Sequence, residues 1–218
     1  MQVDMQAHWQ DVYGHKAPDR VSWFRPHLER SRDHILALPV GPDARIVDIG
    51  GGASTLIDDL LAAGRRNVAV LDLSAEALAH SRARLGADAD AVDWRVGDAT
   101  LPQFEPQSVD VWHDRAVFHF LTDPDDRAAY VEQVLQAVRP GGHVIVATFA
   151  PDGPERCSGL PVQRYDADGI HAAFGDAFVK VGQAAEYHRT PAGGEQSFVY
   201  CFCRRAGSLP VDSHRSGR

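Results

Sequence analysis

The chain has 218 residues and a formal net charge of -8, with 22 basic and 30 acidic side chains. This length is enough to bury a substantial core, and we expect one domain. Because the basic residues are scattered rather than clustered, we expect no nucleic-acid partner.

Cysteine content and apolar runs exclude further classes of protein. Cys157, Cys201 and Cys203 are too few and too late in the chain for a disulfide framework, and no C-x-x-C pair indicates a zinc site. The N-terminal segment lacks an apolar signal core, and the longest apolar run, residues 144–150, is too short to span a bilayer. We therefore expect a soluble, cytoplasmic protein without a membrane partner or a metal site. The sequence leaves the oligomeric state open between a monomer and a weak dimer.

Apolar periodicity places two helices ahead of the first strand, over residues 4–16 and 26–38. Short apolar runs then alternate with amphipathic segments. Ser74 is a candidate N-cap, and Asp123 followed by Pro124 marks another helix start. The pattern predicts strands over residues 44–50, 67–73, 91–98, 108–114 and 143–150, and helices over residues 54–64, 75–86 and 123–138.

The last part of the chain breaks this alternation. A short helix is expected near residues 166–175, and two extended runs, 178–190 and 196–205, are joined by the turn-rich segment 191–195. The whole pattern predicts a Rossmann-like, doubly wound α/β fold whose mostly parallel sheet ends in an antiparallel C-terminal hairpin.

Three consecutive glycines follow the first strand in the stretch IVDIGGGAST. Gly50, Gly51 and Gly52 lie on the first strand-to-helix turn, where the backbone of a doubly wound sheet comes closest to a ligand. The dinucleotide fingerprint G-x-G-x-x-G is only partly matched, because Thr55 stands at the third glycine. This counts against NAD or FAD. Tight packing of strand on helix, without a ligand, is the alternative interpretation of the turn.

Acidic residues stand at the ends of three strands around this turn. Asp48 closes the first, Asp72 the second and Asp98 the third. An acid at the tip of the second strand can accept hydrogen bonds from both ribose hydroxyls of an adenosine group, and Asp98 is placed for an adenine amino group. A lone aspartate at a strand end is usually a helix cap or a solvated turn residue, but three around one turn favour a binding site.

Together these motifs resemble those of the class I S-adenosylmethionine-dependent methyltransferases. VDIGGGAS is similar to their D-x-G-x-G-x-[GS] turn, with Ser54 at the third glycine. LDLS resembles the ribose-binding strand end, and GDAT resembles the segment that contacts adenine. The resemblance covers about residues 42–150, and the closing hairpin is similar to the reversed seventh strand of the family. It implies the seven-stranded class I methyltransferase fold.

The resemblance implies S-adenosyl-L-methionine as the cofactor and S-adenosyl-L-homocysteine as the product. It further implies that Gly50 and Gly52 line the methionine part of the cofactor, that Asp72 binds the ribose, and that Asp98 with Ala99 holds the adenine. The complete predicted cofactor set is Tyr13, Trp23, Asp48, Gly50, Gly51, Gly52, Ser54, Thr55, Asp72, Leu73, Asp98, Ala99, Asp114 and Arg115.

We expect a single methyltransferase domain over residues 1–205. It comprises an N-terminal helical cap (1–40), a cofactor-binding core (42–150) and a substrate loop (150–165), and a disordered tail follows over residues 206–218.

The segment WHDRAVFHFL after the fourth strand is similar to the D-[KR]-G-x-x-D segment of small methyltransferases that modify protein lysines. Asp114 and Arg115 match it, whereas Ala116 replaces the glycine and His119 stands at the later aspartate. These departures count against a lysine substrate. The N-P-P-[YF] tetrapeptide of methyltransferases that act on planar amide or base nitrogens is absent.

The same segment supplies the predicted catalytic residues, which are Asp114, Arg115 and His119. His119 could take the proton of the acceptor, because a histidine titrates near neutrality, and Asp114 could orient the base or the substrate. The alternative for His119 is a packed histidine between Phe118 and Phe120. The alternative for Arg115 is a structural ion pair with Asp114 or another acid.

Two further segments are expected to cover the site. In the family, leading segments fold over the cofactor, so Tyr13 and Trp23 are predicted to exclude water and to stack near the sulfonium. Trp9 is more consistent with a hydrophobic clamp on the sheet.

The long connection after the fifth strand offers Arg156, Arg164 and Tyr165, which suit an acidic substrate. Its Cys157 could join the other two cysteines on a soft metalloid, but we favour small buried hydrophobes for Cys201 and Cys203.

The resulting prediction is a methyltransferase that acts on a small molecule, with an acidic one preferred, or on a protein side chain. The alternatives are a protein-lysine methyltransferase specifically, a nicotinamide-dependent oxidoreductase, which shares the acidic end of the second strand, and a subunit that binds the cofactor without catalysis.

Overall fold

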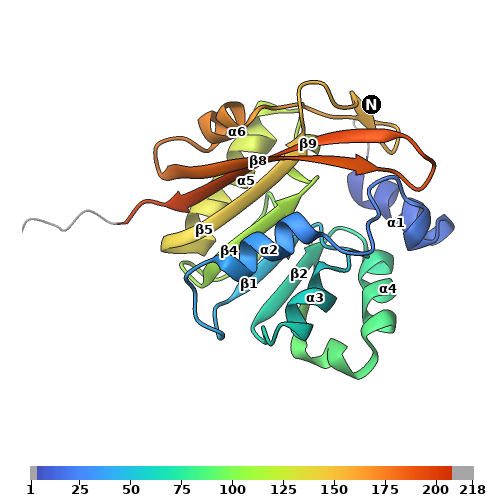
Figure 1. Ribbon diagram of the computed structural model, residues 1–218, viewed down its shortest axis with the longest axis horizontal. Coiled ribbons are helices and arrows are strands. Elements are labelled where there is room, and N and C mark those ends of the chain that lie inside the picture. Colours follow the sequence, from blue (N-terminus) through green and yellow to red (C-terminus); the bar gives the residue numbers. More distant parts are fainter. Residues whose placement is uncertain (1–3, 208–218) are drawn as a thin grey trace, which may run out of the picture.

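The computed structural model describes residues 4–207, and most of the tail expected over residues 206–218 lies outside this range. A seven-stranded sheet carries helices on both faces (Figure 1). Its strands are β1 (Ile46–Ile49), β2 (Val68–Asp72), β3 (Val92–Val96), β4 (Val109–Arg115), β5 (Val138–Phe149), β8 (Phe178–Arg189) and β9 (Glu195–Arg205). The helices are α1 (Met5–His15), α2 (Glu29–Ala37), α3 (Leu56–Ala62), α4 (Ala75–Leu85), α5 (Pro124–Ala137) and α6 (Ala167–Phe174), with short 3-10 segments η1 (Pro18–Arg20), η2 (Gly86–Ala91) and η3 (Phe118–Phe120).

The strand order is β3-β2-β1-β4-β5-β9-β8. Strands β1 to β5 pair in parallel, whereas β9 runs antiparallel to both β5 and β8. This topology confirms the predicted doubly wound, seven-stranded fold with its antiparallel hairpin. The strand order reverses between β1 and β4, and ligands of doubly wound sheets bind beyond the carboxyl ends of the strands at such a point.

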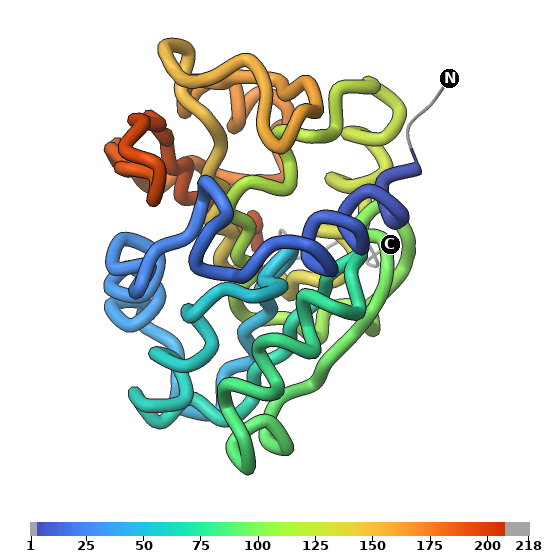
Figure 2. Tube along the Cα trace, turned by 90° about the vertical axis from the view of Figure 1, so that its right-hand side faces the viewer, coloured from blue at the N-terminus to red at the C-terminus, as the bar shows by residue number. Residues whose placement is uncertain are grey.

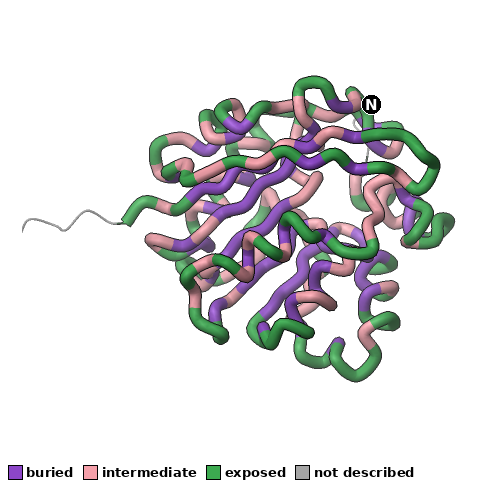
Figure 3. The backbone as a smooth tube through the Cα atoms, in the orientation of Figure 1, coloured by how far each residue is buried: buried purple, intermediate pink, exposed green. Residues whose placement is uncertain are grey.

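Buried side chains on the two faces of the sheet form separate clusters. On β1, Val47 and Ile49 belong to the cluster that includes α5 and α6, whereas Ile46 belongs to the cluster that includes α2 and α3. Strands β1 and β2 are buried over their whole length, and Figure 3 shows both in the colour of buried residues. Burial on both faces explains their continuous apolar sequence.

Capping side chains fix where several helices begin. The side chains of Asp4, Ser74, Asp123 and Asp166 each accept a hydrogen bond from a backbone N–H in the first turn of the helix that follows. The predicted helix starts at Ser74 and at Asp123 are thereby confirmed. Helix α1 contacts α4 and lies across the carboxyl-end edge of the sheet (Figure 2).

Three local features differ from the sequence prediction. Strand β5 begins at Val138, because Val138 pairs with Val109 of β4 ahead of a register shift. Helix α2 begins at Glu29 rather than at residue 26. The connection over residues 150–165 contains a small hairpin of β6 (Arg156–Cys157) and β7 (Leu160–Pro161), which has too few residues to give a periodic signal.

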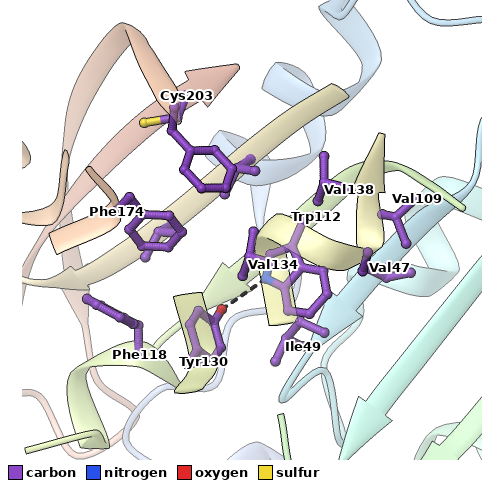
Figure 4. Close-up of a cluster of buried hydrophobic side chains, with 14 of the residues drawn as sticks. Val47, Ile49, Val109, Trp112, Phe118, Tyr130, Val134, Val138, Phe174 and Cys203 are labelled. Atoms are coloured by element: carbon purple, nitrogen blue, oxygen red, sulfur yellow. Dashed lines mark hydrogen bonds between the residues drawn. The ribbon is translucent and has the colours of Figure 1, made fainter. Parts of the chain in front are cut away.

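A buried polar group lies inside the cluster that includes α5 and α6 (Figure 4). Trp112 Nε1 donates to the hydroxyl of Tyr130 (2.9 Å), and this hydroxyl donates to Asp114 Oδ2 (2.5 Å). Asp114 is completely buried, and burial raises the pKa of its carboxyl group to about 6. The Tyr130 hydroxyl therefore stabilises a carboxylate that has lost its water.

We predict that Tyr130→Phe lowers the free energy of unfolding by about 2–3 kcal/mol at pH 8, because it removes one donor to a buried carboxylate and leaves the Nε1 donor of Trp112 unpaired. The folded-state pKa of Asp114 lies above its unfolded value, so ionisation of this carboxyl group lowers the free energy of unfolding as pH rises from about 4 to 6. The mutant should therefore lose less at pH 5, where part of Asp114 is protonated.

Urea unfolding at the two pH values measures both effects. Tyr187→Phe is the control, because Tyr187 is 77% exposed and should not change stability. An equal loss at both pH values would contradict this role of the hydroxyl.

Candidate active site

The glycine turn packs tightly against the segment that follows β4. Gly50 has a φ of +65°, and a Cβ atom there would overlap Cγ2 of Val117. Gly52 also has a positive φ, +36°, and a Cβ atom there would lie 2.7 Å from Asp72 Oδ2. At Gly51 a Cβ atom would lie 2.5 Å from Asp48 Oδ2. The turn needs glycine at these positions because side chains from three strand ends already surround it.

A cavity of about 670 Å³ opens beside this turn at the carboxyl ends of β1, β2 and β4, a volume within the range of small-molecule sites. It is bounded by α1, by the strand ends and by the segment after β4. The lining residues are Asp4, Met5, Gln6, Trp9, Tyr13, Trp23, Ile49, Gly50, Leu71, Asp72, Leu73, Gly97, Asp98, Ala99, Thr100, Leu101, Gln103, Arg115, Ala116, Val117, Phe120, Leu121, Asp126 and Cys157.

Asp72 lies at the tip of β2 and lines the cavity. The backbone N–H of Ser74 donates to its Oδ1 (2.8 Å). Burial is the main reason that the pKa of Asp72 rises to about 7, and the nearby charge of Asp48 raises it further. A hydroxyl donor from a ligand would compensate for the solvation that Asp72 loses on burial, and it would favour the ionised form of the carboxyl group.

Asp98 lines the same cavity from the segment after β3. Its Oδ1 accepts hydrogen bonds from the backbone N–H and from the hydroxyl of Thr100, both at 2.8 Å. These bonds hold the carboxylate at the cavity wall beside Leu73 and Ala99, which are also predicted site residues.

Asp48 faces a second, small cavity of about 40 Å³ behind the glycine turn, which Gly51 and Ser54 also line. Its Oδ1 lies 2.7 Å from His113 Nδ1, and His113 Nε2 lies 2.8 Å from the hydroxyl oxygen of Ser31. The ring of His113 thus connects β1 with α2 beneath the turn.

An aromatic cluster covers the large cavity. Trp9 and Tyr13 come from α1, Trp23 follows η1 and Phe120 lies in η3. The ring of Trp9 contacts Trp23 and Phe120 edge-on, with centroid distances of 5.6 Å and 5.1 Å. Tyr13 is buried, and burial raises the pKa of its hydroxyl. Trp9, which the sequence suggested as a clamp on the sheet, lines the cavity together with the two predicted cap residues.

Arg115 lies at the end of β4, and its side chain is 4% exposed. Nη2 donates to Glu186 Oε1 (2.6 Å), and Nε donates to the hydroxyl of Tyr200 (3.2 Å). The guanidinium carbon is 4.0 Å from the centroid of the Phe198 ring. Arg115 thus pairs with an acid of β8 rather than with Asp114, and it also lines the large cavity.

Asp114 lines neither cavity and instead organises the segment after β4. Its Oδ1 accepts from the backbone N–H of Val117 (2.9 Å), and its Oδ2 accepts from that of Phe118 (3.0 Å). Ala116, at the position where the lysine-methyltransferase pattern has glycine, has a φ of +74°. The backbone therefore keeps a conformation that favours glycine, although the residue is alanine.

His119 is completely buried and is not brought to either cavity. Its ring packs beside Phe120 and Phe149, and the backbone N–H of Phe149 donates to its Nδ1 (3.3 Å). Burial, followed by the charge of Arg115, lowers the pKa of His119 to about 3. The imidazole is therefore neutral at physiological pH, and its position is that of a packed core histidine.

The connection after β5 contributes a thiol rather than a cation. Arg156 and Arg164 bind within the connection, to the carbonyl oxygen of Gly159 and to Glu155 Oε1, and neither lines the cavity. Cys157 does line it, and burial raises the pKa of this thiol to about 12.

Cys201 and Cys203 lie in the core cluster that includes α5 and α6, with their sulfur atoms 3.5 Å apart. Cys157 belongs to the other cluster. Among residues 4–207 no group of three or more His, Cys, Asp or Glu side chains is arranged to hold a metal ion. None of the helices within the same range has the length and apolar character needed to cross a bilayer.

The predicted site residues therefore divide into three groups. The large cavity is lined by Tyr13, Trp23, Gly50, Asp72, Leu73, Asp98, Ala99 and Arg115. The small cavity is lined by Asp48, Gly51 and Ser54, and it shares Tyr13, Trp23, Gly50 and Arg115 with the large one. Neither cavity is lined by Gly52, Thr55, Asp114 or His119. Sequence reasoning did not place Met5, Phe120 or Leu121 at the site. Only the helical spacing of α1 could have indicated Met5, one turn before Trp9.

Comparisons with known proteins agree with this geometry. Residues 46–142 match the family model described as a methyltransferase domain. The chain is 29% identical over 112 residues to a ubiquinone/menaquinone biosynthesis C-methyltransferase of Ruegeria, covering 50% of this chain and 44% of that protein. It is 31% identical over 119 residues to a demethylmenaquinone methyltransferase of Mycobacterium, covering 55% of this chain and 47% of that protein. The chain thus spans about half the length of these curated relatives.

A solved structure has the same fold. The 1,6-didemethyltoxoflavin-N1-methyltransferase of Burkholderia thailandensis, with bound 1,6-didemethyltoxoflavin and S-adenosylhomocysteine, has a TM-score of 0.60 and 22% identity, covering 92% of this chain and 84% of that chain. Residues 46–142 thus match a methyltransferase domain, and the sheet topology and the strand-end motifs are similar to those of the class I S-adenosylmethionine-dependent methyltransferases.

The residues at the cavity fit the adenosyl cofactor of this family. The carboxylate of Asp72 faces the cavity as a hydrogen-bond acceptor suited to ribose hydroxyls, and Asp98 offers a second acceptor on the next strand end. The aromatic cluster supplies apolar faces to the same cavity. Gly50 borders both cavities, so bare backbone is available between them.

We predict that Gly50→Ala is more destabilising than Gly64→Ala. Both glycines have positive φ, but a Cβ atom at Gly64 has no heavy atom within 4 Å, whereas one at Gly50 overlaps Val117. Gly64→Ala should cost about 1–2 kcal/mol from backbone strain alone. Gly50→Ala should cost about 1–3 kcal/mol more, because Val117 must move. Thermal or urea unfolding of the two variants measures the difference, and equal losses would contradict the close packing of the turn.

Proposed function

We propose that this protein binds S-adenosyl-L-methionine in the large cavity and transfers its methyl group to a small, largely apolar acceptor. The observation that carries the proposal is the shared cavity. Gly50, Asp72 and Asp98 line it together with the aromatic cluster of Trp9, Tyr13, Trp23 and Phe120. One cavity can therefore hold a cofactor and an acceptor side by side.

On this proposal each strand end has a separate task in holding the cofactor. Asp72 accepts hydrogen bonds from the ribose hydroxyls, and Asp98 with Ala99 contacts the adenine. Gly50 lies along the methionine part. Support comes from their order along the cavity wall, which follows the strand order β1, β2, β3.

The cofactor supplies an activated methyl group on a cationic sulfur. The protein's task is then to bring the nucleophile into line with that methyl carbon and to exclude water. Tyr13, Trp9 and Trp23 present aromatic rings toward this region, and such rings attract a cation and bury its apolar surroundings. Asp114 acts at a distance, since it holds Val117 and Phe118 by their backbone and so sets the shape of the cavity wall.

His119 has a structural part in this proposal. Its low pKa and its burial outside the cavity suit packing against Phe149 rather than proton transfer. The general base is then unnecessary, or it belongs to the acceptor, as when a nucleophilic carbon or an ionised oxygen attacks the methyl group directly.

The charges around the cavity favour an uncharged acceptor over an acidic one. The carboxylates of Asp4, Asp72, Asp98 and Asp126 line the cavity, and Arg115, the one arginine among its lining residues within 4–207, is paired with Glu186. The two arginines of the connection after β5 do not line it. An apolar acceptor is also consistent with the relatives, whose names refer to quinone biosynthesis.

Incubation with S-adenosylmethionine labelled on the methyl group tests the proposal. After incubation with a cell extract, label should appear in small molecules that an organic solvent extracts, and not in precipitated protein. Label in lysine residues of protein would contradict a small-molecule acceptor. The Asp72→Ala variant in the same extract controls for other methyltransferases.

Asp72→Ala should weaken S-adenosylhomocysteine binding by more than tenfold, about 1.4 kcal/mol or above, because hydrogen bonds to a carboxylate are lost without opening the core. Calorimetric titration measures the affinity, and thermal unfolding verifies that the variant is folded. Unchanged affinity in a folded variant would remove Asp72 from the cofactor site.

The pH dependence of binding provides a separate prediction. The folded-state pKa of Asp72 is raised to about 7, so below pH 7 a proton must leave before the carboxylate can accept both ribose hydroxyls. Affinity for S-adenosylhomocysteine should therefore rise with pH between 5.5 and 7, by up to about tenfold per unit. Asp72→Asn should remove most of this dependence, and an equally steep profile in that variant would assign the titration to another group.

Thermal unfolding with different ligands separates the remaining alternatives. Stabilisation by S-adenosylmethionine and S-adenosylhomocysteine, but not by NADH, is expected, because a ligand that binds only the folded state raises the unfolding midpoint. Stabilisation by NADH alone would favour a nicotinamide-dependent oxidoreductase. Stabilisation by the adenosyl compounds without transfer to any extract component would favour a binding subunit.

A further inference from the structure

Arg115 has an unusual combination of burial and incomplete hydrogen bonding. Its side chain is 4% exposed, yet it lines the large cavity. Nη2 and Nε are directed to β8 and β9, where Glu186 and Tyr200 accept their hydrogen bonds. Within residues 4–207, no partner of the remaining nitrogen, Nη1, is found. A guanidinium fixed on two sides therefore has one pair of N–H groups left over.

The surroundings of Arg115 hold the guanidinium in one orientation. Phe198 lies against its face, with the guanidinium carbon 4.0 Å from the ring centroid. The hydroxyl of Tyr200 also donates to Glu186 Oε2 (3.2 Å) and lies 3.2 Å from the hydroxyl of Ser31. Each acceptor of Arg115 is thus itself fixed by a neighbour. An arginine held in this way has little conformational entropy to lose on binding.

The charge of Arg115 is already balanced within the protein. Glu186 binds Arg115 at 2.6 Å and Arg25 at 3.3 Å, and these charges keep the pKa of Glu186 below its ordinary value. A second carboxylate on Arg115 would lie close to Glu186 and to the acidic cavity wall. A neutral or weakly charged oxygen satisfies Nη1 without that repulsion.

We infer that Nη1 of Arg115 donates a hydrogen bond to an oxygen atom of the acceptor, a carbonyl or phenolic oxygen carried by an apolar ring, and that Arg115 thereby selects such acceptors. This inference rests on the proposed function, because it assigns a specificity-determining residue to the same cavity. The nearby aromatic rings cover the apolar body of the acceptor, while Arg115 recognises its oxygen. Glu186 and Tyr200 are positioning residues, since they act on the acceptor only through Arg115.

An isosteric pair of probes isolates the oxygen. 1-Tetralone carries a ring carbonyl, and in 1-methylenetetralin a CH2 group replaces its oxygen. We expect the wild-type protein, saturated with S-adenosylhomocysteine, to bind 1-tetralone at least about tenfold more tightly, because the other probe leaves a buried N–H unpaired. Equilibrium dialysis measures both dissociation constants. Equal affinity for the two probes would overturn the inference.

The informative variant removes both members of the ion pair. Arg115→Met alone leaves Glu186 buried near Arg25 only and could fail to fold, whereas Arg115→Met with Glu186→Gln leaves no new uncompensated charge. In the double variant the preference for 1-tetralone should disappear. Persistence of the preference would show that another group binds the oxygen, and would overturn the inference.

Two single variants act as controls. Glu186→Gln keeps Arg115, so some preference for the carbonyl should remain. Arg25 is the other cation that binds Glu186, and it lines the small cavity but not the large one. Arg25→Met should therefore retain the full preference. Loss of the preference in Arg25→Met but not in the double variant would assign the oxygen to Arg25 and contradict the role of Arg115.

Cofactor affinity separates this inference from the proposed function. The double variant should bind S-adenosylhomocysteine with an affinity within about threefold of the wild type. A large loss of this affinity without a change in probe preference would indicate that Nη1 binds the cofactor, and would overturn the inference. The titration with both probes is repeated without S-adenosylhomocysteine. If the wild type does not bind that compound at all, the proposed function fails, whereas the preference for the carbonyl is still measured.

Discussion

The buried carboxylate of Asp114 is the constraint on which the rest of the site depends. Its two oxygens bind the backbone N–H groups of Val117 and Phe118 and the hydroxyl of Tyr130. These bonds turn the chain sharply after β4 and press Val117 against Gly50. The glycine turn, the wall of the cavity and the end of β4 therefore have one shared geometry. Since the carboxylate is completely buried, it can remain charged only while these donors are in place.

The N-terminal segment covers the cavity at the carboxyl ends of the strands. Without it, the row of turns at this edge of the sheet would form a concave surface open to solvent. Helix α1 crosses this row, with Tyr13 beside Gly52 and the backbone carbonyl of Tyr13 3.2 Å from His80 Nε2 of α4. Gln10 accepts from Ser74, the N-cap of α4 (3.0 Å). These two contacts join α1 to the helix that follows Asp72, so the cap is held in place next to this strand end.

Local patterns were sufficient to predict the fold and to predict that the strand-end residues gather around the glycine turn. The glycines of IVDIGGGAST and the aspartates at successive strand ends are encoded in short stretches, and their meeting point follows from parallel pairing alone. The pairing of Arg115 with Glu186 joins β4 to β8, and no local pattern reveals which acid an arginine will meet. For the same reason, the prediction of Arg156 and Arg164 as substrate ligands could not anticipate that both bind inside their own loop. His119 shows a further limit, because burial sets its pKa and the local sequence does not reveal that this side chain is buried.

The acidic wall of the cavity has a consequence for a reaction that consumes a cationic cofactor. Carboxylates near a sulfonium favour the charged ground state, so they tighten its binding while they oppose the loss of charge during transfer. Two features reduce this cost. Asp72, with a pKa near 7, and Asp98, with its Thr100 donors, carry charge that is partly compensated by the backbone. The rings of the aromatic cluster are uncharged, and their attraction for a cation is weaker and short-ranged. On the proposed placement of the cofactor, the carboxylates serve the ribose and adenine while the uncharged rings provide a milder environment for the sulfonium. The product has lost the sulfonium charge, so the carboxylates attract it less and it can leave.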